Sequence, residues 1–120
     1  MARLLVVDDE AFIRMYLEEV LADEGHEVHS ASGGAAALAL LRNGGPRPHL
    51  ILLDLMMPGM NGWEFRAAQA RDPLLADIPV VLLSGAGDVQ AEARRLGAQG
   101  FVTKPFLPAQ LFAAIAGLAA

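Results

Sequence analysis

Cysteine is absent from this chain of 120 residues. The chain therefore has no disulfide framework and no thiolate metal site, and its stability must come from packing. Positive charge is also scarce, because 14 Asp and Glu residues against 9 Lys and Arg residues give a net charge of -5. This balance disfavours direct binding of nucleic acid, whose phosphates attract basic proteins.

Long apolar runs are missing as well. Charged or turn-forming residues interrupt each run well short of the length that spans a membrane. The first nine residues, which end in Asp8-Asp9, are too short and too acidic for a secretory signal. We therefore expect a soluble, cytoplasmic protein without a membrane partner. Its length and its hydrophobic content of 54% suit one domain over residues 1–120 with its own core.

Short apolar runs predict strands at residues 4–7, 28–31, 50–53, 80–83 and 101–103. Segments of helical spacing or composition follow each of them, with Gly25 and Gly97 as helix stops and Pro108 in a first turn. The helices whose bounds can be given are residues 35–42, 63–71 and 88–96. Five strands that alternate with five helices indicate βαβ units with right-handed crossovers, and hence an α/β parallel sheet between two helix layers.

Residues with useful chemistry follow four of these strands. The acidic pair Asp8-Asp9 follows the first, Asp54 the third, Ser84 the fourth, and Lys104 the fifth. In an open parallel sheet the carboxyl ends of adjacent strands meet at one edge, where ligands bind. Three carboxylates, one hydroxyl and one ammonium would converge there, which indicates a site for a phosphoryl group and a divalent cation.

The chemistry assigns a role to each of these groups. Magnesium prefers hard oxygen ligands, which Asp8, Asp9 and Asp54 can supply. Because clustered carboxylates repel one another, we expect at least one raised pKa among them. A carboxylate can attack phosphorus, and Asp54, alone at its strand end, is our nucleophile. Lys104 would neutralise phosphoryl oxygens, and Ser84 would donate to one of them and sense its arrival.

Each residue taken alone also has a simpler interpretation. The pair Asp8-Asp9 could belong to a helix N-terminus, Asp54 could start a turn, and Ser84 could be a cap or turn residue. Lys104 alone would be a solvated surface charge, and Phe101 could be a half-buried strand aromatic. Their joint placement at four strand ends favours the functional interpretation.

The segment Asp54 to Gly62, together with Asp8-Asp9, Ser84 and Lys104-Pro105 in this order, resembles the receiver domain of two-component response regulators. The resemblance covers essentially the whole chain and is closest to stand-alone, chemotaxis-regulator-like members. It implies a flavodoxin-like doubly wound sheet of strand order 2-1-3-4-5.

By this resemblance Asp54 is the phosphoacceptor, and Mg²⁺ is held by Asp8, Asp9, Asp54 and the backbone carbonyl of Met56. Ser84 and Lys104 would contact the phosphoryl group, Ser84 and Phe101 would act as switch residues, and the Lys104-Pro105 peptide would be cis. The chain has Ser84 where many members have threonine, and Phe101 lacks the hydroxyl of the commoner tyrosine. Met56 is apolar beside the path of attacking water, which bears on the lifetime of the aspartyl phosphate.

The sequence thus predicts a phosphorylation-activated switch rather than a dedicated enzyme, although the domain would catalyse its own phosphoryl transfer and autodephosphorylation. A histidine kinase or histidine phosphotransfer protein would supply the phosphoryl group. A downstream target protein or a second copy would bind the face of the fourth helix, fifth strand and fifth helix. Two rivals are a metal-dependent aspartyl phosphatase, which usually has an acid at the position of Met56, and a binding module that is never phosphorylated.

Overall fold

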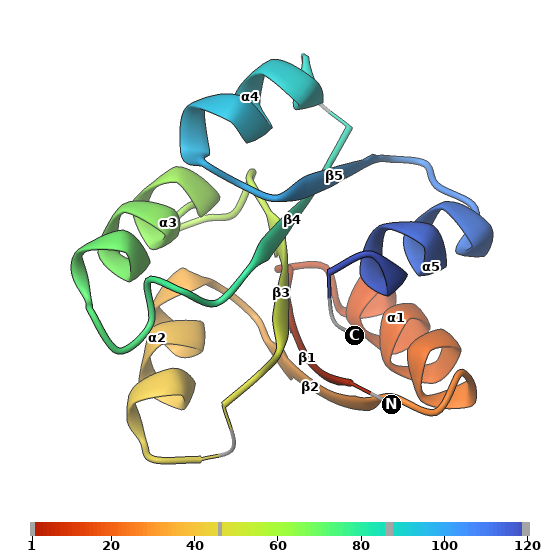
Figure 1. Ribbon diagram of the computed structural model, residues 1–120, viewed down its shortest axis with the longest axis horizontal. Helices are drawn as coiled ribbons and strands as arrows, with labels where there is room; N and C mark the ends of the chain where they lie inside the picture. The colour runs from red at the N-terminus through yellow and green to blue at the C-terminus, as the bar shows by residue number, and fades with distance from the viewer. Residues whose placement is uncertain (1, 46, 86–87, 119–120) are drawn as a thin grey trace.

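The computed structural model describes residues 2–45, 47–85 and 88–118, in which five strands alternate with five helices (Figure 1). The strands are β1 (Arg3–Val7), β2 (Glu27–Ala31), β3 (Leu50–Asp54), β4 (Val80–Ser84) and β5 (Gly100–Thr103). The helices are α1 (Ala11–Asp23), α2 (Gly34–Arg42), α3 (Gly62–Arg71), α4 (Val89–Leu96) and α5 (Pro108–Ala116). All ten expected elements are present, and the bounds stated above differ from these by no more than about one residue.

All neighbouring strands pair in parallel, and their order is β2-β1-β3-β4-β5. This order confirms the flavodoxin-like doubly wound fold. The chain runs from β1 outward to β2, and then crosses to the other side of β1 to form β3. The direction of winding therefore reverses between β1 and β3, and ligands of such sheets bind at the carboxyl ends of the strands beside that point.

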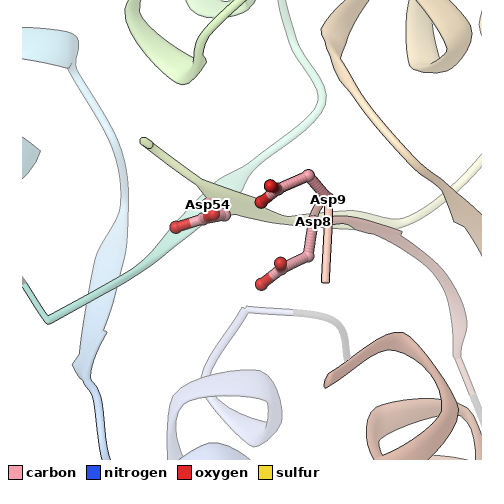
Figure 2. Close-up of side chains that lie close together, drawn as sticks. All are labelled: Asp8, Asp9 and Asp54. Carbon is pink, nitrogen blue, oxygen red and sulfur yellow. The ribbon is translucent and has the colours of Figure 1, made fainter. Parts of the chain in front are cut away.

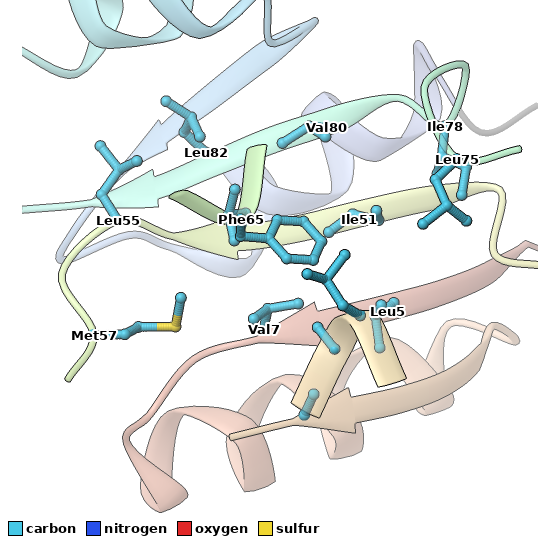
Figure 3. Packing of buried hydrophobic residues seen from close by; sticks show 14 of the residues in the cluster. Leu5, Val7, Ile51, Leu55, Met57, Phe65, Leu75, Ile78, Val80 and Leu82 are labelled. Atoms are coloured by element: carbon cyan, nitrogen blue, oxygen red, sulfur yellow. The ribbon is translucent and has the colours of Figure 1, made fainter. Parts of the chain in front are cut away.

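The sheet separates two apolar cores. Alternate side chains of a strand point to opposite faces, so Leu5 and Ile51 meet Phe65 of α3 on the face that α2, α3 and α4 cover (Figures 1 and 3). Leu4 and Leu52 lie on the opposite face, against α1 and α5. Burial on both faces explains why the strands read as unbroken apolar runs. Among the described residues, no helix combines the length and the apolar character needed to cross a membrane.

The start of α3 is packed directly onto the end of β3. Asn61 caps this helix by accepting from the Glu64 N–H, and the Glu64 side chain accepts from the Asn61 N–H. Gly62 follows, and a Cβ placed there would lie 2.6 Å from the Asp54 carbonyl oxygen and 2.7 Å from the Leu55 Cα. Only glycine permits this approach of backbone to backbone. The two ends of the loop between Asp54 and α3 therefore lie against each other, and the Gly62 N–H donates to the Leu55 carbonyl at 2.9 Å.

Candidate functional site

Three carboxylates come together at the carboxyl end of the sheet. Asp8 and Asp9 follow β1, and Asp54 is the last residue of the adjacent strand β3 (Figure 2). One carboxylate oxygen from each lies within 4.8 Å of the others. Asp8 and Asp54 are buried, at 0% and 4% exposure, and Asp9 is half-buried. The structure thus brings together the acidic residues that the sequence placed at one edge.

Asp8 is held on both oxygens of its carboxylate. Oδ1 accepts a hydrogen bond from the Glu10 N–H at 2.9 Å, and Oδ2 accepts one from the Lys104 Nζ at 2.9 Å. The Asp8 N–H donates to the Ala31 carbonyl of β2 at 3.2 Å. The N-cap of α1 is Glu10, which has no side-chain cap bond. Asp8 therefore faces the strand ends and does not cap the helix.

Lys104 follows β5 and reaches across the strand ends to the carboxylates. Its Nζ lies 2.9 Å from Asp8 Oδ2 and 3.4 Å from Asp54 Oδ1, and 19% of its side chain is exposed. Burial acts to lower the pKa of Lys104, but the hydrogen bonds and charges of Asp8 and Asp54 outweigh it and raise that pKa. The ammonium therefore stays charged at neutral pH. The Lys104-Pro105 peptide is cis, as the resemblance implied.

The pKa of the Asp54 carboxyl is raised above its ordinary value, chiefly because burial disfavours the charged form. The charge of Lys104 opposes this shift, the charge of Asp8 adds to it, and hydrogen bonds from Lys104 and the Met56 N–H oppose it. A raised pKa in the cluster was expected, but from repulsion between carboxylates. Burial is the larger cause because Asp54 lies between the buried end of β3 and the start of α3.

The other candidate residues lie around this centre. Ser84 is 1% exposed at the end of β4, one residue beyond Leu83, which pairs with Asp54. Phe101 lies on the edge strand β5 and is 40% exposed, and the Met56 side chain is 59% exposed. The proposed roles of Ser84, Phe101 and the Met56 carbonyl are predictions that these positions do not test.

Sequence reasoning missed one residue at the site. The Arg14 guanidinium of α1 donates from Nη1 to the Asp8 carbonyl oxygen at 2.7 Å. Nothing in the sequence signals this bond, because the two residues lie six positions apart across the boundary between a strand end and a helix. The capping box of Asn61 and Glu64 was also missed, although its N-x-x-E pattern precedes α3 in the sequence.

Large apolar side chains are exposed on α1 and just before α5. Phe12, Met15 and Tyr16 of α1 are 85%, 63% and 39% exposed, and Leu107 before α5 is 68% exposed. A cavity of about 340 Å³ lies between α1 and the segment that follows β5. It is lined by Glu10, Ile13, Tyr16, Lys104, Pro105 and Phe106. The same lysine that contacts the carboxylates therefore also borders this cavity.

The acidic cluster fits a magnesium ion. The donor set consists of carboxylate oxygens within 4.8 Å of one another, two of them from buried residues. Mg²⁺ prefers oxygen ligands and is usually held by one or two carboxylates together with phosphate oxygens and water. The residues present therefore have the chemistry that this ion requires.

Comparison with known proteins matches residues 4–116 to the response regulator receiver domain family. The chain is 41% identical over 115 residues to the phosphate regulon transcriptional regulatory protein PhoB of Escherichia coli (strain K12), covering 94% of this chain and 49% of that protein. It is 36% identical over 115 residues to the probable transcriptional regulator ycf27 of Porphyridium aerugineum, covering 94% of this chain and 46% of that protein. The chain thus spans about half the length of the curated relatives it matches.

Solved structures with the same fold match nearly all of this chain. The chemotaxis protein CheY4 of Vibrio cholerae superimposes with a TM-score of 0.89 at 32% identity, covering 98% of both chains. NtrX of Brucella abortus gives a TM-score of 0.83 at 34% identity, covering 98% of this chain and 27% of that one. The same fold is therefore found both in a protein of this size and within a much longer one.

Proposed function

We propose, from the premise that this chain belongs to the response regulator receiver domain family, that Asp54 is its phosphoacceptor and that phosphorylation switches its contacts with a partner. The observation that carries this proposal is the placement of the Asp54 carboxylate, beside the acidic pair and 3.4 Å from the Lys104 ammonium. A nucleophile, a set of metal ligands and a fixed cation are the parts that phosphoryl transfer to a carboxylate needs.

In the proposed step an Asp54 carboxylate oxygen attacks the phosphorus of a phosphohistidine on the donor protein. The new P–O bond forms as the P–N bond breaks, and the electron pair of that bond stays on the imidazole nitrogen, which takes up a proton. Only the ionised carboxylate can attack, so the raised pKa of Asp54 makes transfer slower in acid. The positive charge of Lys104 favours the ionised form of Asp54 and so opposes the rise in its pKa.

Asp8, Asp9, Asp54 and the Met56 carbonyl would hold Mg²⁺, which supplies positive charge for the phosphoryl oxygens when it is bound. Lys104 would transfer its hydrogen bond from the carboxylates to a phosphoryl oxygen, and the Ser84 hydroxyl would donate to another. A change in these bonds at the ends of β4 and β5 would alter the packing of neighbouring elements. Phe101 on β5 is the proposed reporter.

Two surfaces serve the proposed partners. Tyr16 lines the cavity at Lys104, and Phe12, Met15 and Leu107 are further exposed apolar side chains of α1 and of the residue before α5. These exposed apolar groups support docking of the histidine kinase or phosphotransfer protein on this side. The face of α4, β5 and α5, which bears Phe101, is the proposed contact for a downstream target or a second copy. Residues 1–120 would act as one domain in the cytoplasm, as a switch that catalyses its own transfer and autodephosphorylation.

The test is intact-mass measurement after incubation with acetyl phosphate, with and without Mg²⁺. We expect a single phosphoryl adduct on the wild type with Mg²⁺ and none on Asp54→Asn. Asp23→Asn is the matched control, because it removes an exposed carboxylate of α1, and it should be labelled like the wild type. Normal labelling of Asp54→Asn would contradict the assignment.

If the wild type forms no adduct, binding of beryllofluoride separates the alternatives. Binding indicates a phosphoryl group that is lost quickly. No binding, with a folded protein, favours the module that is never phosphorylated.

A further inference from the structure

Arg14 is bonded to the backbone of the acidic pair rather than to a carboxylate. It lies in the first turns of α1, where its N–H donates to the Glu10 carbonyl at 3.1 Å. Its side chain turns back toward β1 and donates from Nη1 to the Asp8 carbonyl oxygen at 2.7 Å. Asp8 lies beyond the last paired residue of β1, Val7. This carbonyl is therefore held by a side chain where the sheet ladder has ended.

The bonded carbonyl belongs to the peptide unit that joins Asp8 to Asp9. A peptide unit is planar and rotates as one body, so a bond to this oxygen limits rotation between the two residues that carry the carboxylates. The Asp8 side of the unit is already fixed, because the Asp8 N–H bonds to Ala31 and its carboxylate bonds to the Glu10 N–H and to Lys104. Within the part of the chain that the structure describes, no hydrogen bond or ion pair holds the Asp9 carboxylate in this way. The bond from Arg14 to the Asp8 carbonyl therefore restricts the orientation of the peptide unit that leads to Asp9.

We propose that Arg14 is a positioning residue that holds the Asp8-Asp9 peptide so that both carboxylates face a divalent cation. This inference rests on the metal site of the proposed function. Mg²⁺ demands near-octahedral geometry, and groups that orient metal ligands are typically worth about 10 to 100-fold in metal affinity. The planar guanidinium suits the task because its donors are fixed relative to one another and its charge strengthens the hydrogen bond.

The sign of the effect distinguishes positioning from electrostatics. A positive guanidinium beside a cation site repels the ion, so removal of its charge alone would tighten Mg²⁺ binding. Loss of the hydrogen bond would instead loosen binding, because the Asp9 carboxylate would sample more orientations. A weaker Mg²⁺ complex after removal of Arg14 is therefore a result that charge cannot produce.

The experiment is isothermal titration of Mg²⁺ into the wild type, Arg14→Met and Arg14→Lys, with thermal unfolding of each. We expect Arg14→Met to weaken Mg²⁺ about tenfold and Arg14→Lys, which keeps the charge and a donor, to recover part of the loss. Arg66→Met is the matched control, because Arg66 Nε donates to the Leu96 carbonyl at 2.8 Å between α3 and α4. It should lose stability while its Mg²⁺ affinity stays within about twofold.

Unchanged or tighter binding by Arg14→Met would overturn the proposal, as would equal weakening by Arg66→Met. If Arg14→Met fails to fold, Arg14→Gln takes its place with the same expectations, because glutamine is a good helix former and too short to reach the same carbonyl. A wild type that binds no Mg²⁺ would overturn the metal site and this inference together. Binding by the wild type with no change in the variants would overturn this inference alone.

Discussion

In the central strands β3 and β4, the body consists of apolar residues, whereas the carboxyl end is a polar residue. Residues 50–53 of β3 are apolar and have 0% exposure, whereas Asp54, the next residue, keeps a carboxylate at 4% exposure. Strand β4 repeats the pattern, with four apolar residues before Ser84. Burial of the apolar body stabilises the fold, whereas burial of a polar group costs free energy unless partners compensate it. Burial of the apolar strand bodies therefore offsets the free-energy cost of burying polar groups at the strand ends.

Removal of side-chain volume from the body should have the largest effect on stability. Leu52 of β3 has 0% exposure and packs among Leu17 and Leu111 of the helices on that face. We expect Leu52→Ala to lower the free energy of unfolding by about 3 kcal/mol, measured by urea denaturation. The folded fraction should still take a phosphoryl group from acetyl phosphate. A loss below about 1 kcal/mol would contradict the role given to the strand body.

Removal of the cation from the strand ends should have the next largest effect. Lys104→Ala leaves the buried carboxylates of Asp8 and Asp54 without their ammonium. We expect a loss of about 2 kcal/mol without Mg²⁺, the size of a hydrogen bond to a charged group. Added Mg²⁺ should raise the melting temperature of this variant more than that of the wild type, because it restores positive charge among the carboxylates. Phosphorylation should persist while the switch weakens. An equal Mg²⁺ response in both proteins would contradict this account.

Removal of the buried charge itself should stabilise the protein. Because the pKa of Asp54 is raised on folding from its ordinary 3.8, the folded state disfavours the ionised form at neutral pH. Asp54→Asn should therefore raise the free energy of unfolding at pH 7, although it should abolish phosphorylation.

The pH dependence of that gain follows from the direction of the shift. Stability that the wild type has below the unfolded pKa of about 3.8 is lost as pH rises through the folded pKa. The advantage of Asp54→Asn should therefore grow across that window and fade toward acid. Thermal unfolding of both proteins from pH 3.5 to 7 measures it, and a constant difference would exclude Asp54 as its source.

The smallest effect is expected at the loop that joins the strand end to α3. Asn61→Ala removes a cap bond of 2.9 Å to the Glu64 N–H, and we expect a loss of about 0.5 kcal/mol, since water can replace the bond. Phosphorylation should be unchanged, because the Gly62 N–H still holds the loop at the Leu55 carbonyl. A large drop in labelling would mean that the cap positions the loop beside Asp54.

The sequence predicted the fold well because its signals are local and mutually consistent. Unbroken apolar runs, helix stops such as Gly25 and Gly97, and regular alternation left one architecture. The convergence of Asp8, Asp9, Asp54 and Lys104 also followed, since parallel strands bring their carboxyl ends to one edge.

What could not be predicted depends on side chains that reach across element boundaries. Nothing local distinguishes Arg14, which bonds to Asp8, from an arginine in solvent. Gln69 is another case, because it is fully buried and donates to the carbonyls of Leu75 and Ile78 in the turn before β4. Such bonds arise only once tertiary packing has set the distances. The bond from Arg14 to the Asp8 carbonyl is one of them.

The bond between Lys104 and Asp8 joins residues 96 positions apart in the chain. During synthesis Asp8 emerges 96 residues before Lys104, so β1 and β3 can bring the carboxylates together before their ammonium exists. Contacts of such long range form late in folding, because much of the chain must first be ordered. The complete site therefore appears only when β5 has docked, and a chain that stops short of it presents acidic groups without their counterion. The proposed phosphoryl-accepting site would therefore be assembled only after β5 has been made and has packed beside β4.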